Sequence, residues 1–431
     1  MKLSVLVLHN LGDPLLWRQA LVEKELCLPI MSAKNNYIVH DAELPLPDFV
    51  KDIHFDAIML TQTFLSKRSD PRLYKRLREN YSFIKDSPAF KIALPQDDYT
   101  CCDILDRWMH EWNVDLVYTV CINDWHILYK EYHKTNRLVQ GYTGYISDAL
   151  IERGKITKPI QDRSIDVSYR AASLSPVFGK LGKIKTEIGD LFEKASRGCG
   201  LKLDLSTRPS STIVGKAWLD FIEDSKCMLG VNSGSSLLDP EGLINIDVYK
   251  YMQLHSSASY EEVEAACFPG LDGIYTFTSI SPRNMECGLL KTTQLLTPGS
   301  YGNFIMPWEH FIPIEPDMSN FSEIISVLKD VGRMDKITAD CKEALLSFPE
   351  LRYANHVSDL IDRIQNGTIL SDTERNSATP LFKKYQQLKD NLNKSYWWKK
   401  RAAMKLREGL ADLGARKAKY IIYSLINIEK N

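Results

Sequence analysis

Short apolar runs alternate with amphipathic segments along the first third of the chain. Each run is long enough for one buried strand and is followed by a pattern of helical period. The runs are Leu3–Leu8, Ala57–Leu60, Ile92–Leu94 and Leu116–Val120. Strands that alternate with helices in this way predict a mostly parallel sheet with helices on both faces.

The pattern restarts near residue 165. Strands are predicted at Ile165–Tyr169, Leu201–Leu205, Cys227–Val231 and Gln294–Leu296, and helices over 184–194, over 217–224 and from Pro282 onward. We therefore expect an α/β protein with two Rossmann-like lobes, residues 1–155 and 156–366, and a cleft between them. Ligands of such sheets bind beyond the carboxyl ends of the strands.

The last part of the chain, residues 367–431, has a different composition. Residues 367–380 predict a linker, because they combine Gly367, Thr368, Ser371, Asp372, Ser377 and Pro380. Residues 394–419 then carry nine Lys and Arg against two acidic residues, with aromatic residues at 396–398 and 420–423. A basic amphipathic helical tail of this kind suits an anionic membrane surface, contacted through residues 394–423. The alternative is a helix that packs on the protein by its aromatic residues.

Composition limits the classes of function. The 431 residues are 44% hydrophobic and 25% charged, which is typical of a globular protein. A formal net charge of −1 gives no electrostatic support for a nucleic-acid partner. The nine cysteines are scattered without a C-x-x-C pair, so we expect a reducing compartment and no zinc site. With no signal-peptide pattern and no apolar run near the roughly 18 residues of a membrane span, we expect a cytoplasmic protein.

The segment Ile280–Glu286 carries the strongest candidate chemistry. Ser281 is a natural N-cap, and Pro282 suits the first turn of a helix. A helix N-terminus offers unpaired N–H groups to an anion, and Arg283 adds a fork suited to phosphate. Glu286, one turn later, could accept hydrogen bonds from a ribose or sugar hydroxyl. The segment thus predicts a nucleotide-sugar site, with an ordinary capped helix as the alternative.

Two further loops follow predicted strands and carry charge. Asp97 and Asp98 could supply a general base or hold acceptor hydroxyls, or they could form a turn and helix cap. Arg170 precedes a segment with two glycines and three lysines, residues 179–185, in which Lys183 is a candidate for phosphate. No D-x-D spacing occurs anywhere in the chain, so we expect no metal-dependent site.

A loop of small residues follows the strand at 227–231. Ser233 and Ser235 leave room for a ligand, and Asp239 and Glu241 supply carboxylates. Paired carboxylates at a glycosyl centre can act as nucleophile and acid/base. The alternative is a turn in which Asp239 caps a helix near Leu243. His310, further on, has no metal-ligand spacing to a second histidine, and a structural role is its default.

Taken together, these residues resemble the group-1-like glycosyltransferases of the GT-B fold, over roughly residues 160–365. The resemblance rests on Asp166–Arg170, Leu229–Ser236, Ile280–Glu286, Tyr301-Gly302, His310–Pro313 and Asp317–Asn320. The Gln96–Tyr99 loop is similar to the matching element of a bacterial branch. The resemblance implies two Rossmann-like lobes and metal-independent transfer from a nucleotide-sugar without a cofactor. It also implies a donor site on the second lobe, to which Ser233, Ser235, His310 and Asn320 would belong.

One departure from the family concerns the donor sugar. Many retaining members carry a Glu-x7-Glu motif, whose second glutamate matches Glu286, but Thr278 stands in place of the first. Asp239 is then the candidate carboxylate at the anomeric carbon. A looser similarity links the chain to bacterial transferases that move Kdo from CMP-Kdo with an aspartate nucleophile.

The expected function is transfer of a sugar to a glycan or lipid-linked acceptor in bacterial surface polysaccharide or lipopolysaccharide synthesis. The enzyme would lie at the inner face of the cytoplasmic membrane. A GT-B nucleotide-sugar epimerase and a non-catalytic sugar-nucleotide-binding scaffold are the alternatives.

Overall fold

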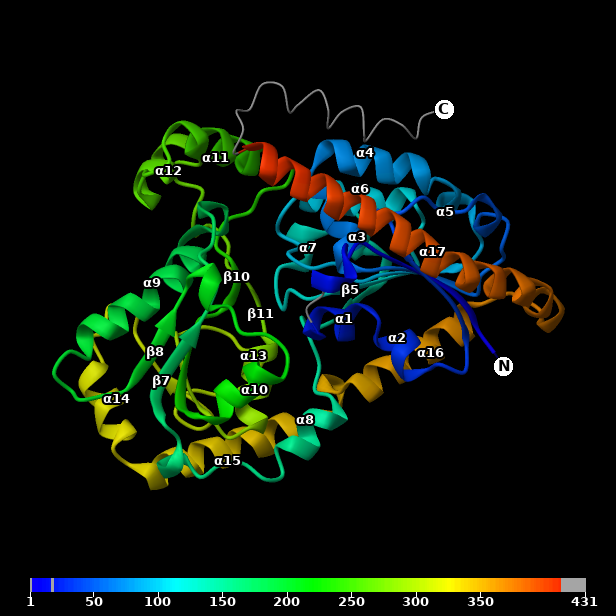
Figure 1. Cartoon of the computed structure of the whole chain (residues 1–431). Coiled ribbons are helices and arrows are strands. Elements are labelled where there is room, and N and C mark those ends of the chain that lie inside the picture. The colour runs from blue at the N-terminus through cyan, green and yellow to red at the C-terminus, as the bar shows by residue number, and fades with distance from the viewer. Residues whose placement is uncertain (1, 17–18, 412–431) are drawn as a thin grey trace.

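Six parallel strands build the sheet of the first lobe, in the order β2-β1-β3-β4-β5-β6 (Figure 1). The structure, a computed structural model, describes residues 2–16 and 19–411. The strands are β1 (Ser4–His9), β2 (Asn36–Asp41), β3 (Ala57–Leu60), β4 (Phe90–Ala93), β5 (Leu116–Thr119) and β6 (Leu138–Gln140). Val5 of β1 lies between Tyr37 of β2 and Ala57 of β3, which fixes the register of the central strands.

Alternate side chains of these strands enter two separate cores. Leu6 and Leu8 point to one face, where they pack with α4, α5, α6 and α17, whereas Val5 and Val7 pack with α2 and α16 on the other. Helices cover both faces, as the sequence predicts. The helices that precede the second lobe are α1 (Gln19–Glu25), α2 (Cys27–Met31), α3 (Gln62–Leu65), α4 (Pro71–Asn80), α5 (Phe83–Asp86), α6 (Cys102–Glu111), α7 (Trp125–Leu128) and α8 (Asp148–Arg153).

The second lobe has a five-stranded parallel sheet in the order β13-β12-β9-β7-β8 and a separate two-stranded antiparallel sheet. The strands are β7 (Ile165–Arg170), β8 (Leu203–Ser206), β9 (Ser225–Gly230), β12 (Thr293–Leu296) and β13 (Ile312–Pro313), with β10 (Ser233–Ser235) and β11 (Phe277–Ser279) in the two-stranded sheet. The helices are α9 (Gly179–Ala195), α10 (Lys216–Glu223), α11 (Leu243–Leu254), α12 (Tyr260–Cys267), α13 (Pro282–Leu289), α14 (Phe321–Leu328) and α15 (Val331–Ser347). This confirms the predicted fold class, two Rossmann-like lobes with a helical extension.

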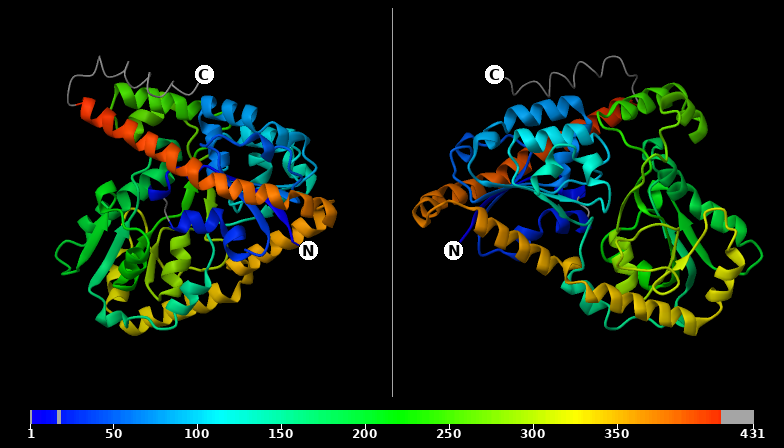
Figure 2. Two further views of the ribbon diagram at one scale, coloured as in Figure 1. Left: turned by 45° about the vertical axis from the view of Figure 1, so that its right-hand side comes forward. Right: turned by 180° about the vertical axis from the view of Figure 1, so that it is seen from behind.

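The chain returns to the first lobe after α15. In Figure 1 and both views of Figure 2, α16 (Tyr353–Gly367) leads from the second lobe to the first, and α17 (Asp372–Ala411) runs back across the first lobe. Val357, Leu360 and Ile364 of α16 are buried among first-lobe residues, although the sequence pattern groups them with the second lobe. A linker over 367–380 is wrong from Asp372 onward, because α17 begins there and contains Pro380.

Buried contacts fasten α17 to the first lobe. The Arg375 guanidinium lies 2.9 Å from the Asp56 carboxylate, and both side chains are buried. The Tyr385 hydroxyl lies 2.8 Å from Nδ1 of His40. Further along, Trp397 is 3% exposed, whereas Trp398 is 68% exposed. The tail therefore packs on the protein at least as far as Trp397.

The basic residues of α17 are only partly free for a membrane. Lys400 is paired with Glu43, and Arg401 lies 3.2 Å from Asp13, both in the first lobe. The rest of the predicted membrane segment, residues 412–423, lies outside the described residues. Within the described part of the chain, no helix is long and apolar enough to cross a membrane.

Candidate functional site

The two lobes meet through backbone hydrogen bonds between their loops. The amide of Cys101 donates to the carbonyl of Asp239 at 2.7 Å, and the amide of Asp239 donates to the carbonyl of Tyr99 at 3.2 Å. A second contact joins the amide of Ile122, just after β5, to the carbonyl of Thr278 in β11 at 3.1 Å. Loops that follow strands of the first sheet thereby lie against loops and the two-stranded sheet of the second lobe. The site lies along this junction.

The N-terminus of α13 is capped by its own side chains. The Ser281 hydroxyl accepts from the Arg283 amide at 3.3 Å, and the Asn284 side chain accepts from the Ser281 amide at 3.0 Å. Pro282 occupies the first turn, as the sequence predicts. This capping box already uses N–H groups that the sequence suggested for an anion. An anion here must therefore be held chiefly by side chains, with the helix dipole in support.

Arg283 is held between two aromatic rings. Its guanidinium carbon lies 5.7 Å from the Tyr169 ring and 5.4 Å from the Trp218 ring. One terminal nitrogen donates to the carbonyl of Arg170, while Nε is buried without a hydrogen-bond partner. Among the described residues, Arg283 has no carboxylate within ion-pair distance. The position of its charge is thus fixed without a direct ion pair to a described carboxylate.

Lys185 brings a second cation to the same place. Burial and the Arg283 charge lower the pKa of Lys185 to about 8, and Asp97 acts in the opposite direction. No described residue forms an ion pair or hydrogen bond with the Lys185 ammonium. Two close cations without a carboxylate partner repel one another, so a bound anion would relieve an existing strain. Sequence reasoning missed Lys185, although its helical segment was recognised.

Lys183, the lysine chosen from the sequence, lies elsewhere. Its ammonium is paired with Glu261 of α12 and lies 5.5 Å from the Tyr260 ring. Residues two apart on an α-helix project about 200° apart, so Lys183 and Lys185 occupy different faces of α9. The helical period is the only sequence feature that could have separated them.

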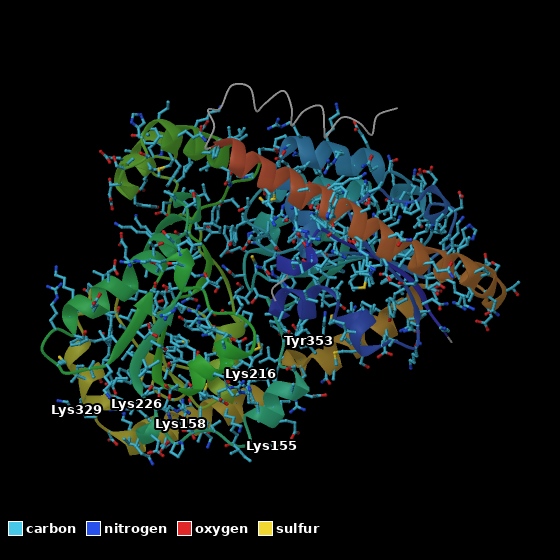
Figure 3. The ribbon with its side chains drawn as sticks, viewed as in Figure 1. Lys155, Lys158, Lys216, Lys226, Lys329 and Tyr353 are labelled. Atoms are coloured by element: carbon cyan, nitrogen blue, oxygen red, sulfur yellow. The ribbon has the colours of Figure 1, made fainter. Side chains whose placement is uncertain are left out.

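Glu286 lines a cleft between the lobes. Trp218 Nε1 donates to its Oε2 at 2.8 Å, and Oε1 has no hydrogen-bond partner among the described residues. Burial raises the pKa of Glu286, while the Trp218 bond and Arg283 lower it. The cleft has a volume of about 770 Å³ and is also lined by Lys216 and Tyr353, which Figure 3 labels at the boundary of the two lobes.

The first-lobe side of the site separates the roles of Asp97 and Asp98. The Asp98 carboxylate is fully buried and accepts hydrogen bonds from the hydroxyls of Thr119 at 2.5 Å and Tyr129 at 2.7 Å. Burial raises the pKa of Asp98. Asp97 is exposed, accepts one hydrogen bond from the Tyr99 hydroxyl at 2.7 Å, and lies close enough to Lys185 to affect its pKa. Of the two carboxylates, Asp97 alone is accessible to a substrate.

Asp239 and Glu241 lie apart from these groups. The Asp239 carboxylate accepts from the amides of Ile244 at 3.2 Å and Asn245 at 2.9 Å, and therefore caps α11. Glu241 forms a two-point ion pair with Arg107 at 2.7 and 2.8 Å. Both residues line a separate groove of about 360 Å³ beside α11. The structure does not bring them to the cleft that Glu286 lines.

Other residues chosen from the sequence support the local backbone. Arg170 is bonded to Asp204 at 2.7 Å, and only its carbonyl contacts Arg283. Ser235 is buried and donates to the Leu237 carbonyl at 2.8 Å, while Ser233 pairs with Ser279 in the two-stranded sheet.

Two of the candidates stabilise loops near β13. His310 Nδ1 accepts from the Met306 amide at 2.9 Å, and the Asn320 side chain accepts from the Glu315 amide at 3.0 Å. Over residues 2–16 and 19–411, no group of three or more His, Cys, Asp or Glu is placed to hold a metal ion.

Comparisons with known proteins add a resemblance in fold. No family model matches the sequence, and a search of curated proteins finds no match either. Solved structures with a similar chain path include a glycosyltransferase from Rickettsia africae (TM-score 0.49, 9% identity, covering 86% of this chain and 100% of that one). A second is an alpha-glucosyltransferase in complex with UDP and DNA (TM-score 0.48, 12% identity, covering 85% of this chain and 100% of that one). A third is Anabaena HepE in complex with UDP-glucose (TM-score 0.47, 9% identity, covering 84% of this chain and 100% of that one). Likeness at these TM-scores identifies no substrate for this chain.

Proposed function

We propose that the chain is a glycosyltransferase that uses a nucleotide-sugar donor. The observation that carries this proposal is the pair Arg283 and Lys185, two adjacent cations without a carboxylate partner in the described structure. Arg283 is close enough to Glu286 to lower its pKa, and Glu286 keeps one carboxylate oxygen free at a cleft of about 770 Å³. A nucleoside diphosphate needs this combination of cations, a ribose acceptor and an open cleft.

Each group then has a distinct task. Arg283 and Lys185 bind the two phosphates, since charge-assisted hydrogen bonds to phosphate are strong and directional. Glu286 accepts hydrogen bonds from the ribose hydroxyls through Oε1. The nucleoside occupies the cleft beside Trp218, whose indole is fixed by its bond to Glu286.

The transfer step uses the same cations. An acceptor hydroxyl bonds to the anomeric carbon as the bond from that carbon to the phosphate oxygen breaks, and the nucleoside diphosphate leaves with the electron pair. Arg283 and Lys185 stabilise the charge that develops on the leaving oxygen. Asp97, the accessible carboxylate of the first lobe, takes the proton of the acceptor hydroxyl. This assignment leaves Asp239 to the cap of α11, and its role as nucleophile stays a prediction.

The identity of the acceptor rests on the sequence. A glycan or lipid-linked acceptor in bacterial surface polysaccharide synthesis remains a prediction. Transfer of Kdo from CMP-Kdo and association with the membrane also remain predictions. An epimerase would use the same donor site without an acceptor, and a scaffold would bind the donor without turnover.

Isothermal titration calorimetry with UDP, GDP, TDP and CMP tests the proposal directly. We expect one of them to bind, and Arg283→Ala to weaken that binding by about 1.5–3 kcal/mol through loss of a charge-assisted contact. Lys183→Ala is the matched control, because Lys183 is paired with Glu261. Failure of all four nucleotides to bind would remove the proposal. Binding followed by release of nucleotide only when an acceptor is present separates a transferase from the two alternatives.

A further inference from the structure

A second cavity between the lobes has no charged residue in its lining. Its volume is about 470 Å³, and the described residues that surround it include no Asp, Glu, Lys, Arg or His. They come from the segments after β5 and β9, from β6 and β11, and from the loop after β12. The polar groups are carboxamides and hydroxyls, including Asn123, Gln140, Asn232 and Thr278. This cavity differs sharply from the charged cleft beside Glu286.

Two carboxamides of this lining, one from each lobe, have an unused acceptor. The Nδ2 group of Asn123 donates to the Thr276 carbonyl at 2.9 Å, and that of Asn232 donates to the Pro298 carbonyl at 3.2 Å. The Oδ1 atom of each is buried without a hydrogen-bond partner. Native proteins keep few such buried acceptors, because each loses its hydration without compensation. An incoming ligand with O–H donors would satisfy them.

Glycine at position 299 explains the close packing around Asn232, which is 3% exposed. A Cβ atom at Gly299 would lie 1.9 Å from Nδ2 of Asn232, and its φ of +151° is one that other residues rarely adopt. The loop after β12 therefore lies directly on the Asn232 carboxamide and holds it in the lining.

Aromatic rings supply the apolar part of the same cavity. Tyr142 and Phe304 both line it, and their ring centroids are 5.6 Å apart with the planes at 73°. Rings beside carboxamides and hydroxyls suit a ligand that has both apolar C–H faces and hydroxyl groups. A sugar ring has this character.

The cavity lies next to the proposed phosphate site along α9. Leu181 lines it, and Lys185 follows one turn later on the same face of α9. On the other side of that site, Pro282 and Glu286 of α13 line the larger cleft. Each cation therefore lies within about one helical turn of a residue that lines a hollow: Lys185 of the cavity and Arg283 of the cleft.

We propose that this cavity binds an uncharged pyranose, and that it selects against acidic sugars. Sugar hydroxyls donate to the free carboxamide oxygens of Asn123 and Asn232, and the rings of Tyr142 and Phe304 contact the C–H face. An acidic sugar would bury its carboxylate without a counter-charge, which is unfavourable. The inference deepens the proposed function and rests on it for the nucleotide-linked form of the sugar. It disfavours Kdo, which is an acid, as the occupant.

Two matched pairs of ligands test the charge preference. UDP-glucose and UDP-glucuronate differ only at C6, where glucuronate carries a carboxylate, and UDP alone gives the baseline. Methyl glucoside and methyl glucuronide repeat the comparison without a nucleotide, by saturation-transfer NMR on the full chain. We expect the neutral member of each pair to bind at least about tenfold more tightly, because the acid must bury a charge. Equal binding of glucoside and glucuronide, or binding of neither, would overturn the inference.

Variants locate the sugar on the protein. Asn123→Asp and Asn232→Asp place a carboxylate in the lining and should reduce methyl glucoside binding at least about tenfold. Ser300→Trp, at an exposed position of the lining, should block the cavity if the buried variants do not fold. Asn376→Asp, exposed on α17, is the control and should leave binding unchanged. An unaltered glucoside signal in folded Asn123→Asp, Asn232→Asp and Ser300→Trp would overturn the inference.

Competition separates donor from acceptor sugar. A methyl glucoside signal that disappears with saturating UDP-glucose but not with UDP assigns the cavity to the donor sugar, and one that persists with UDP-glucose assigns it to the acceptor. Glucoside binding without binding of any nucleotide would support the cavity and remove the proposed function. If a nucleotide binds, but methyl glucoside does not and UDP-glucose binds no more tightly than UDP, the proposed function is supported and the sugar cavity is removed.

Discussion

Lys183 and Lys185 lie two residues apart on α9 and have opposite electrostatic surroundings. Lys183 is paired with Glu261, whereas Lys185 has no ion-pair partner in the described structure and faces the charge of Arg283. The helix directs Lys183 towards α12 of its own lobe and Lys185 towards Arg283. The two residues therefore form a natural pair for experiments on the proposed phosphate site.

Lys185→Ala should weaken nucleotide binding by about 1.5–3 kcal/mol, because a charge-assisted contact to phosphate is lost. Lys183→Ala should change binding by no more than about 0.5 kcal/mol, since exposed ion pairs contribute little. Calorimetric titration of both variants with the nucleotide that binds the wild type measures the difference. Equal effects of the two substitutions would mean that Lys185 does not contact phosphate.

Nucleotide affinity should decrease as the pH rises through about 8. Burial and Arg283 lower the pKa of Lys185 to about 8 in the free protein. A bound phosphate favours the charged lysine and raises its pKa, so the complex retains a proton that the free protein loses above pH 8. Binding is therefore strongest below that pH and is accompanied by proton uptake above it.

Lys185→Arg provides the control for this pH dependence, because arginine stays charged throughout the range. Its affinity should vary less between pH 7 and pH 9.5 than that of the wild type. Lys24, whose pKa burial lowers to about 8, is unchanged in the variant and does not affect the comparison. Identical pH profiles for the wild type and Lys185→Arg would show that another group titrates.

The buried strands were the most predictable part of this protein. Ala57–Leu60 coincides with β3, and Leu116–Val120 extends one residue beyond β5. A short apolar run between polar segments is most readily buried as a single strand. β2 contains Asn36, His40 and Asp41, and β6 has only three half-buried residues. Neither has an apolar pattern that sequence reasoning could detect, since both are set by pairing with their neighbours.

Side-chain partners were the least predictable part. The sequence allowed two roles for Asp239, a catalytic carboxylate and the cap of a helix near Leu243, and its bonds from the amides of Ile244 and Asn245 confirm the cap. The sequence predicted a linker around Pro380. Packing of Phe382 and the buried ion pair of Arg375 with Asp56 instead make this segment part of a helix. The helix around Pro380 depends on these tertiary contacts, which override local composition.

Asp97→Asn and Asp239→Asn should behave differently. Loss of a general base at Asp97 should lower turnover by about 10²–10⁴-fold with little change in melting temperature. Asp239→Asn should keep turnover within a few-fold, because asparagine also caps helices, while Asp239→Ala should cost about 0.5–2 kcal/mol of stability. Steady-state rates and thermal unfolding measure both effects. Loss of turnover in a stable Asp239→Asn variant would restore Asp239 as the catalytic carboxylate.

Arg375→Met should destabilise the protein by about 3–5 kcal/mol, because it leaves the buried Asp56 carboxylate without its partner. Denaturant unfolding measures the change. Substitution of Arg363, whose ion pair with Asp359 is partly exposed, is the control and should cost no more than about 1 kcal/mol. A similar small cost for Arg375→Met would mean that α17 is not fastened by this pair.

Trp397 and Trp398 separate packing of the tail from membrane binding. Trp397 is 3% exposed and Trp398 is 68% exposed, because neighbours on a helix project about 100° apart and only Trp397 faces the protein. Trp397→Ala should cost about 3–5 kcal/mol of stability through the cavity it leaves. If the tail binds anionic lipid, Trp398→Ser should leave stability unchanged and reduce co-sedimentation with phosphatidylglycerol vesicles, because interfacial tryptophans insert at the headgroup level.

Point variants are preferable to removal of residues 381–431, because Phe382 and Tyr385 are part of the first-lobe core and their loss should unfold it. Vesicle binding should also weaken as salt rises, since basic residues act on anionic lipid within about a Debye length, ~10 Å at 0.1 M. The exposed Lys394 and Lys405 supply this attraction, whereas Lys400 and Arg401 are already paired with Glu43 and Asp13. Lys394→Gln with Lys405→Gln should therefore weaken binding more than Lys400→Gln with Arg401→Gln. Wild-type protein that ignores phosphatidylglycerol vesicles at low salt would leave α17 as a helix whose aromatic residues serve packing alone.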